Sequence, residues 1–209
     1  MAKEKSIKLI FRDPEFWAIL AFNLFILYAY YIGTTSVQTV IVLYFLQSTL
    51  IGVQTFIRMM GMGFKQPPKT SFSNRFGTAF FFAFHYGFFH LVYFIFIIAI
   101  VGGMKGGLDF TLIASATLFM FISMVLSLVS DIKRDMSVGA KPMGIMFQPY
   151  FRILPMHIFI IVGFNTEEES ITSAFVIFIA LKTVADLLMH IVVNQTFARR
   201  RPKAIEGWI

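Results

Sequence analysis

Six long stretches of apolar residues dominate this sequence of 209 residues, and they constrain its fold more than any other feature. A helix that crosses ~30 Å of hydrocarbon at ~1.5 Å per residue needs about 20 apolar residues. The six stretches approach or exceed that length and cover residues 15–33, 36–60, 78–101, 110–130, 145–165 and 171–196. We therefore expect an all-α fold, a polytopic membrane protein whose single domain is a bundle of six transmembrane helices.

The composition excludes most other classes of protein. Hydrophobic residues make up 57% of the chain and charged residues only 14%, against roughly 25% charged in an ordinary soluble domain. So apolar a chain is neither a soluble globular protein nor a disordered one, and membrane lipids are its expected partners. The absence of cysteine removes disulfides, iron–sulfur clusters and thiolate metal sites.

The positions of the basic residues predict the orientation in the membrane. Four basic residues lie within 3–12, four within 58–75, three within 133–141 and four within 199–203, whereas the opposite side carries only Lys105. Because basic residues concentrate on the cytoplasmic side, we expect both termini in the cytoplasm. The net charge of +7 is then explained by topology and by anionic headgroups, and it does not indicate a nucleic-acid partner.

The last apolar stretch carries three ionisable residues at a spacing of four. Lys182, Asp186 and His190 cover only about 80° of a helix circumference, so one face of this helix is ionisable. A charged side chain at the centre of a bilayer costs roughly 2.5–3.5 kcal/mol on insertion scales, so such residues face a protein interior and mark a candidate site.

The other stretches contribute further polar side chains. The third contains His85 and His90, which point ~140° apart on a straight helix, so we expect His90 to point elsewhere. The fifth stretch contains a proline at 155 between two polar residues, which predicts a kinked helix at a polar patch. These two residues are Arg152 and His157, and the second stretch adds Gln54 and Arg58.

The depths of these residues suggest that they share one polar cavity. At ~1.5 Å per residue, most of them lie in the half of the bilayer that the orientation makes cytoplasmic. We therefore expect His85, His157, His190 and Asp186 to converge on one cavity walled by the second, third, fifth and sixth stretches. Gln54, Arg58 and Lys182 are expected in the same cavity.

Imidazole and carboxylate ligands in this cavity would suit a transition metal such as zinc, iron or manganese. Asp186 would then act as a ligand or base, and Arg152 would bind the phosphate or carboxylate of a membrane-soluble substrate. The spacing is equally that of a hydrogen-bonded network of Lys182, Asp186, His190 and Arg152 without a metal. A haem held by two histidines of different helices is the lesser alternative.

Two functions of other classes stay open. A helix broken by proline beside ionisable groups is what a proton- or ion-coupled transporter needs, although no internal repeat is visible. The third alternative is a non-catalytic accessory subunit, in a membrane complex or in a homo-oligomer. The sequence does not decide whether the protein is an enzyme.

Four segments carry a resemblance to a known family: YFLQSTLIGVQTFIRMM, AFHYGFFHLVYFIF, PYFRILPMHIFIIVG and LKTVADLLMHI. They resemble a family of prokaryotic six-span membrane proteins known as a domain of unknown function. The resemblance implies a prokaryotic inner-membrane protein of six spans, and it brings no established activity.

Overall fold

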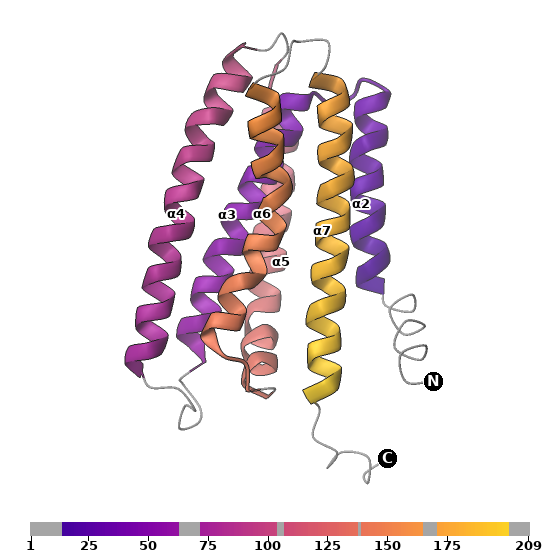
Figure 1. Cartoon of the computed structure of the whole chain (residues 1–209). Coiled ribbons are helices and arrows are strands. Elements are labelled where there is room, and N and C mark those ends of the chain that lie inside the picture. Colours follow the sequence, from indigo (N-terminus) through magenta and orange to yellow (C-terminus); the bar gives the residue numbers. More distant parts are fainter. Residues whose placement is uncertain (1–13, 63–71, 104–106, 138, 165–170, 201–209) are drawn as a thin grey trace.

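The computed structural model describes residues 14–62, 72–103, 107–137, 139–164 and 171–200, and their regular structure is helical. The helices run up and down in turn, so the N-terminal end of α2 and the C-terminal end of α7 lie at the same end of the bundle (Figure 1). Their bounds are α2 Pro14–Tyr31, α3 Val37–Gly61, α4 Phe72–Gly103, α5 Phe110–Ser137, α6 Pro142–Phe164 and α7 Ile171–Arg200.

Five of these helices, α3 to α7, are long and apolar enough to cross a membrane. The protein is therefore all-helical and has the architecture of a multi-pass membrane protein, as the apolar stretches predict. Helix α2 lies beside α7 (Figure 1), but its described apolar part, Ile19–Tyr31, is shorter than the other five. A sixth crossing by α2 stays a prediction.

Two helices extend well beyond the apolar stretches predicted as membrane spans. Helix α4 begins at Phe72 rather than at residue 78, and α5 continues to Ser137 rather than ending at residue 130. The sequence-based limit for α5 was set where charged residues begin. Two of these, Asp131 and Asp135, are held by side chains of α3, so the helix extends past the apolar stretch without leaving them unpaired.

Helix α3 is central, because it packs against α4, α5 and α6, while α7 packs against α6 and α2. Two glycines of α3 allow this close packing. A Cβ atom at Gly52 would lie 2.4 Å from the Tyr86 ring of α4, and one at Gly61 would lie 2.7 Å from Ile132 of α5. A larger residue at either position would force the Tyr86 ring or the Ile132 side chain to shift.

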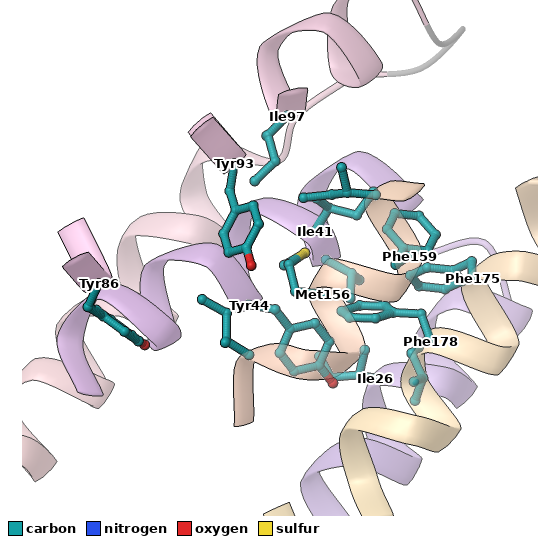
Figure 2. Close-up of a cluster of buried hydrophobic side chains, with 14 of the residues drawn as sticks. Ile26, Ile41, Tyr44, Tyr86, Tyr93, Ile97, Met156, Phe159, Phe175 and Phe178 are labelled. Carbon is teal, nitrogen blue, oxygen red and sulfur yellow. The ribbon is translucent and has the colours of Figure 1, made fainter. Parts of the chain in front are cut away.

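The buried core is formed by α2, α3, α4, α6 and α7. Tyr44 of α3 meets Phe178 of α7 edge to face at 5.4 Å between ring centroids, and Phe159 of α6 lies 4.9 Å from Phe178 (Figure 2). Aromatic pairs at these distances add to the energy of burial. Outside this core, large apolar side chains such as Phe84 and Phe119 are exposed, as lipid-facing residues are.

Candidate functional site

Three charged residues meet deep inside the bundle. Lys182 and Asp186, one turn apart on α7, form a buried ion pair in which the ammonium of Lys182 donates to Oδ2 of Asp186. Nε of Arg152, from α6, lies 3.9 Å from the other carboxylate oxygen of Asp186. Lys182 stands near the middle of the apolar window Ala174–Val192, so this cluster lies at membrane depth.

The cluster continues through aromatic and polar contacts to α3 and α2. The ammonium of Lys182 lies 5.2 Å from the centroid of the Tyr44 ring, a cation–π contact. The Tyr44 hydroxyl donates to Oδ1 of Asn23 at 2.7 Å, and the Asn23 amide donates to the carbonyl of Ile19. Four helices therefore hold the buried Lys182–Asp186 pair in place.

The charges in this cluster do not balance. Arg152 and Lys182 are two cations, and among the described residues Asp186 is the single anion that pairs with them. Arg152 donates no hydrogen bond within the described part of the chain, and its side chain is 31% exposed. Oδ1 of Asp186 is buried and likewise accepts no hydrogen bond from the residues described. The cluster therefore has an excess positive charge and unused hydrogen-bonding capacity.

A second charged cluster joins α3 to α5 and α6. Arg58 holds Asp135 with two hydrogen bonds, Nε to Oδ2 at 2.8 Å and Nη2 to Oδ1 at 2.9 Å, and it also donates to Gln148 at 3.2 Å. Gln54 donates to Asp131 at 2.8 Å and to Ser127 at 3.1 Å. The structure thus gives Gln54 and Arg58 partners on α5 and α6, and not the histidines that the sequence analysis grouped with them.

The partners on α5 were missed because they lie beyond the end predicted for that helix. Asp131 and Asp135 are separated by four residues, so they share one helix face in the same way as Lys182 and Asp186. An intramembrane arginine such as Arg58 needs a carboxylate partner. Together these two signals could have found the pair.

Three of the four histidines bond to hydroxyl groups or to the backbone. Nδ1 of His85 lies 2.7 Å from the Tyr150 hydroxyl, and Nδ1 of His157 lies 2.9 Å from the Tyr93 hydroxyl. His90 bonds through Nδ1 to the carbonyl of Tyr86 and through Nε2 to Ser48. The fourth histidine, His190, is buried in α7 and has an interaction of its own.

The structure gives no support to the predicted metal site. Among the residues that the structure describes, no group of three or more His, Asp or Glu side chains could hold one metal ion. The convergence of His85, His157, His190 and Asp186 on one metal therefore stays a prediction. His85 and His157 use Nδ1 for tyrosine contacts, which leaves Nε2 of each ring as the nitrogen that could bind a metal. A haem stays a prediction that these contacts do not test.

Two hollows open beside these clusters. A groove of about 840 Å³ runs between α6 and α7 and reaches the end of α5, and its walls are mostly apolar. A smaller cleft of about 350 Å³ lies between α4 and α6 and is lined by aromatic residues and His157. Both hollows are of the size at which proteins bind small molecules, about 300–1,000 Å³.

Comparisons with known proteins identify the family of this chain but give no activity. No curated protein and no solved structure matches it. A family profile does match, over residues 8–203, which is nearly the whole chain. The chain therefore belongs to DUF6498, a family of unknown function.

Proposed function

We propose that this protein binds an acidic amphiphile, a membrane-soluble molecule with a carboxylate or phosphate group, between α6 and α7. The observation that carries the proposal is Arg152, a partly exposed arginine at membrane depth that donates no hydrogen bond within the described residues. A guanidinium offers five donors in a planar fork that matches a carboxylate or phosphate. An acidic group would satisfy these donors and neutralise the excess positive charge.

The groove between α6 and α7 supplies a route for the apolar part of such a ligand. Its walls include Phe151, Leu154 and Ile158 of α6 and Leu181, Val184 and Leu188 of α7. Ile145, Gln148 and Pro155 also line the groove, and at ~100° per residue they share one face of α6 with Arg152. Arg152 is not itself a lining residue of the groove, but its neighbours on this face of α6 are, so we expect the acidic group of a ligand to reach the guanidinium from the groove.

The Lys182–Asp186 pair supports this role by positioning Arg152. Asp186 is buried and already bonded to Lys182, so it does not fully neutralise Arg152 at 3.9 Å. The carboxylate keeps the guanidinium near α7 while leaving most of its donors available. Lys182 and Asp186 are accordingly positioning residues, and Arg152 is the residue that contacts the ligand.

Binding of matched acid and ester probes tests the proposal. Protein in nanodiscs of neutral phosphatidylcholine is titrated with oleate, dodecyl phosphate and the methyl ester of oleate, and bound probe is measured against empty nanodiscs. A hydrogen-bonded charge pair contributes about 1.5–3 kcal/mol, which corresponds to a preference of about 10- to 100-fold for an acid over the ester. Oleate and dodecyl phosphate together show whether carboxylate or phosphate is preferred.

Variants assign the preference to one residue. Arg152→Gln should abolish the preference for acids while leaving binding of the methyl ester unchanged, and Arg152→Lys should keep part of it. Lys133→Gln is the matched control, because Lys133 is an exposed cation of α5 outside the groove. Equal binding of acid and ester to the wild type, or an unchanged preference in Arg152→Gln, would contradict the proposal.

The second candidate function is proton-coupled transport, and the buried ion pair favours it. Oδ1 of Asp186 is buried without a hydrogen bond from the described residues, so this carboxylate has a place for a proton. In liposomes with an internal pH dye, a transporter would move protons when a pH gradient is imposed. Asp186→Asn would then abolish the flux, and a wild type with no flux above empty liposomes would rule the candidate out.

We also propose that both termini lie in the cytoplasm of a prokaryotic cell. The distribution of basic residues supports this orientation, and the N-terminal end of α2 and the C-terminal end of α7 lie at the same end of the bundle (Figure 1). Because the chain has no cysteine, single cysteines can be labelled cleanly. In intact cells an impermeant maleimide should label Thr34→Cys and not Lys133→Cys, and the reverse pattern would invert the orientation.

A further inference from the structure

The cleft between α4 and α6 is a second hollow that the proposed function does not use. Its walls come from Tyr86, Phe89 and Tyr93 of α4 and from Tyr150, Ile153 and His157 of α6. Tyr86 and Tyr93 project from α4 toward the interior (Figure 2). Phe147, Phe151 and Leu154 also line the cleft, and each is about half exposed. The cleft is therefore accessible from the lipid-facing surface.

The walls of this cleft combine aromatic rings with neutral polar groups. Tyr93 bonds to His157, Tyr150 bonds to His85, and Tyr86 bonds to Ser48. Among the residues that the structure describes, no charged side chain lines the cleft. We therefore expect a neutral ligand here, unlike the acid proposed for Arg152.

His157 has one nitrogen that no described residue uses. The Tyr93 hydroxyl has no described hydrogen-bond partner other than Nδ1 of His157. In apolar surroundings a phenol proton needs an acceptor, so Tyr93 donates to Nδ1. The neutral imidazole then carries its own proton on Nε2, and Nε2 has no hydrogen-bond partner within the described residues. A cleft that opens to lipid thus contains an unused N–H donor.

We propose that this cleft binds the ring of a membrane-soluble quinone. A quinone carbonyl accepts a hydrogen bond, so it can satisfy Nε2–H of His157. The flat, neutral ring can lie against Phe89 and the tyrosines, while the apolar tail extends into lipid past Phe151 and Leu154. A volume of about 350 Å³ is at the lower end of the usual range for ligand pockets, which suits a single ring better than a porphyrin.

Photolabelling with an azidoquinone tests this site directly. Protein in phosphatidylcholine nanodiscs is labelled, digested and analysed by mass spectrometry, with decylubiquinone or a decyl-substituted trimethoxybenzene without carbonyls as competitor. Label should appear on peptides that contain residues 86–93 or 147–157. Decylubiquinone should suppress this label at concentrations at which the benzene analogue does not. Equal suppression by both compounds would show that only an apolar ring is recognised and would overturn the proposal.

Variants of His157 and its partner test the hydrogen bond. Loss of one neutral hydrogen bond weakens binding by about 2- to 10-fold, so His157→Phe should weaken decylubiquinone competition by this factor. His157→Gln keeps an N–H donor and should restore most of it. Tyr93→Phe removes the hydroxyl that fixes the tautomer and should weaken competition less than His157→Phe does.

A control keeps the result interpretable if a variant is damaged. Phe88→Leu alters an exposed residue of α4 outside the cleft and should bind like the wild type. Size-exclusion chromatography and thermal unfolding show whether each variant is folded. If folded His157→Phe and His157→Gln both bind like the wild type, the assignment of the donor is wrong.

Discussion

The two charged clusters of this protein are built from the same residue types but are bonded differently. In the Arg58 cluster, one arginine meets one carboxylate with two hydrogen bonds and a third bond goes to Gln148. In the Arg152 cluster, two cations share Asp186, and Arg152 donates no hydrogen bond within the described residues. Arg58 and Asp135 of the first cluster thus have hydrogen-bond partners, whereas Arg152 and Oδ1 of Asp186 in the second have none among the described residues.

This difference separates a structural brace from a candidate site. The Arg58 cluster ties α3 to α5 and α6, and its charges and donors leave little for a ligand to satisfy. The Arg152 cluster retains free donors and an excess positive charge. Asp135 and Gln148 of the Arg58 cluster line the large groove, but Arg58 already bonds to both, whereas Arg152 adjoins the lining residue Phe151 and donates no hydrogen bond within the described residues. Buried polar groups that a fold leaves unsatisfied need an explanation, and a ligand is the one that the neighbouring groove supports.

The largest expected effect is a loss of protein stability when the Arg58 cluster, the structural brace, is broken. Asp135→Ala leaves the buried guanidinium of Arg58 without its carboxylate; the two side chains are only 8% and 6% exposed. Removal of one partner of a buried ion pair costs about 3–5 kcal/mol, so thermal unfolding in detergent should shift strongly downward. Arg134→Ala breaks a more exposed ion pair with Asp131 and should cost at most about 1 kcal/mol. Equal shifts for the two variants would contradict the distinction.

Asp186→Asn should have the next largest effect, and it tests the second cluster. This substitution removes the negative charge between Lys182 and Arg152. The amide of the new side chain has nearly the shape of the carboxylate and can still accept a hydrogen bond. We expect a loss of about 2–3 kcal/mol, less than for a complete truncation of a buried partner. The double variant Asp186→Asn with Lys182→Met should regain much of this stability, since it also removes the buried cation. Failure of the double variant to recover would show that charge balance does not govern this region.

The sequence predicted helices well because their signal is local. Apolar stretches long enough to cross a bilayer gave all five helices that the structure shows to be membrane-competent, and the i, i+4 spacing correctly placed Lys182 and Asp186 side by side. Both inferences need only the geometry of one helix. Asp131 and Asp135 were missed because they lie beyond the predicted apolar stretch, and their pairing with α3 is a tertiary contact.

The partners between helices could not be read from the sequence. Depth along each helix placed Arg58, Arg152 and the histidines in one half of the membrane, but depth does not say which helices are neighbours. Tyrosine hydroxyl groups bond to Nδ1 of His85 and of His157, two of the predicted metal ligands. Nothing in the spacing of Tyr93 and Tyr150 reveals this, because each pair joins residues 64 or 65 positions apart.

A smaller effect is expected where α3 passes closest to α5. Gly61→Ala places a methyl group 2.7 Å from Cδ1 of Ile132, next to the Arg58 brace. Ile132 can turn away only partly, so we expect a loss of about 1 kcal/mol, at the low end of overpacking effects. Gly77→Ala is the matched control, because nothing lies within 4 Å of its Cβ position, and it should stabilise α4 slightly. If both variants have the same unfolding temperature, α3 and α5 do not approach this closely.

The smallest change in stability is expected for Arg152→Gln, although this is the variant that should abolish acid recognition. Arg152 contributes no hydrogen bond to the described structure and only a distant contact with Asp186. Because Lys182 still neutralises Asp186, loss of the guanidinium should change the free energy of unfolding by less than about 1 kcal/mol, as for a partly exposed ion pair. Arg58→Gln, the same substitution in the Arg58 cluster, leaves the buried Asp135 without its cation and should lower the free energy of unfolding by about 3–5 kcal/mol. Unfolding of the two variants in the same detergent therefore compares the clusters directly. A large destabilisation by Arg152→Gln would mean that Arg152 supports the fold, and the free guanidinium would then no longer indicate a ligand.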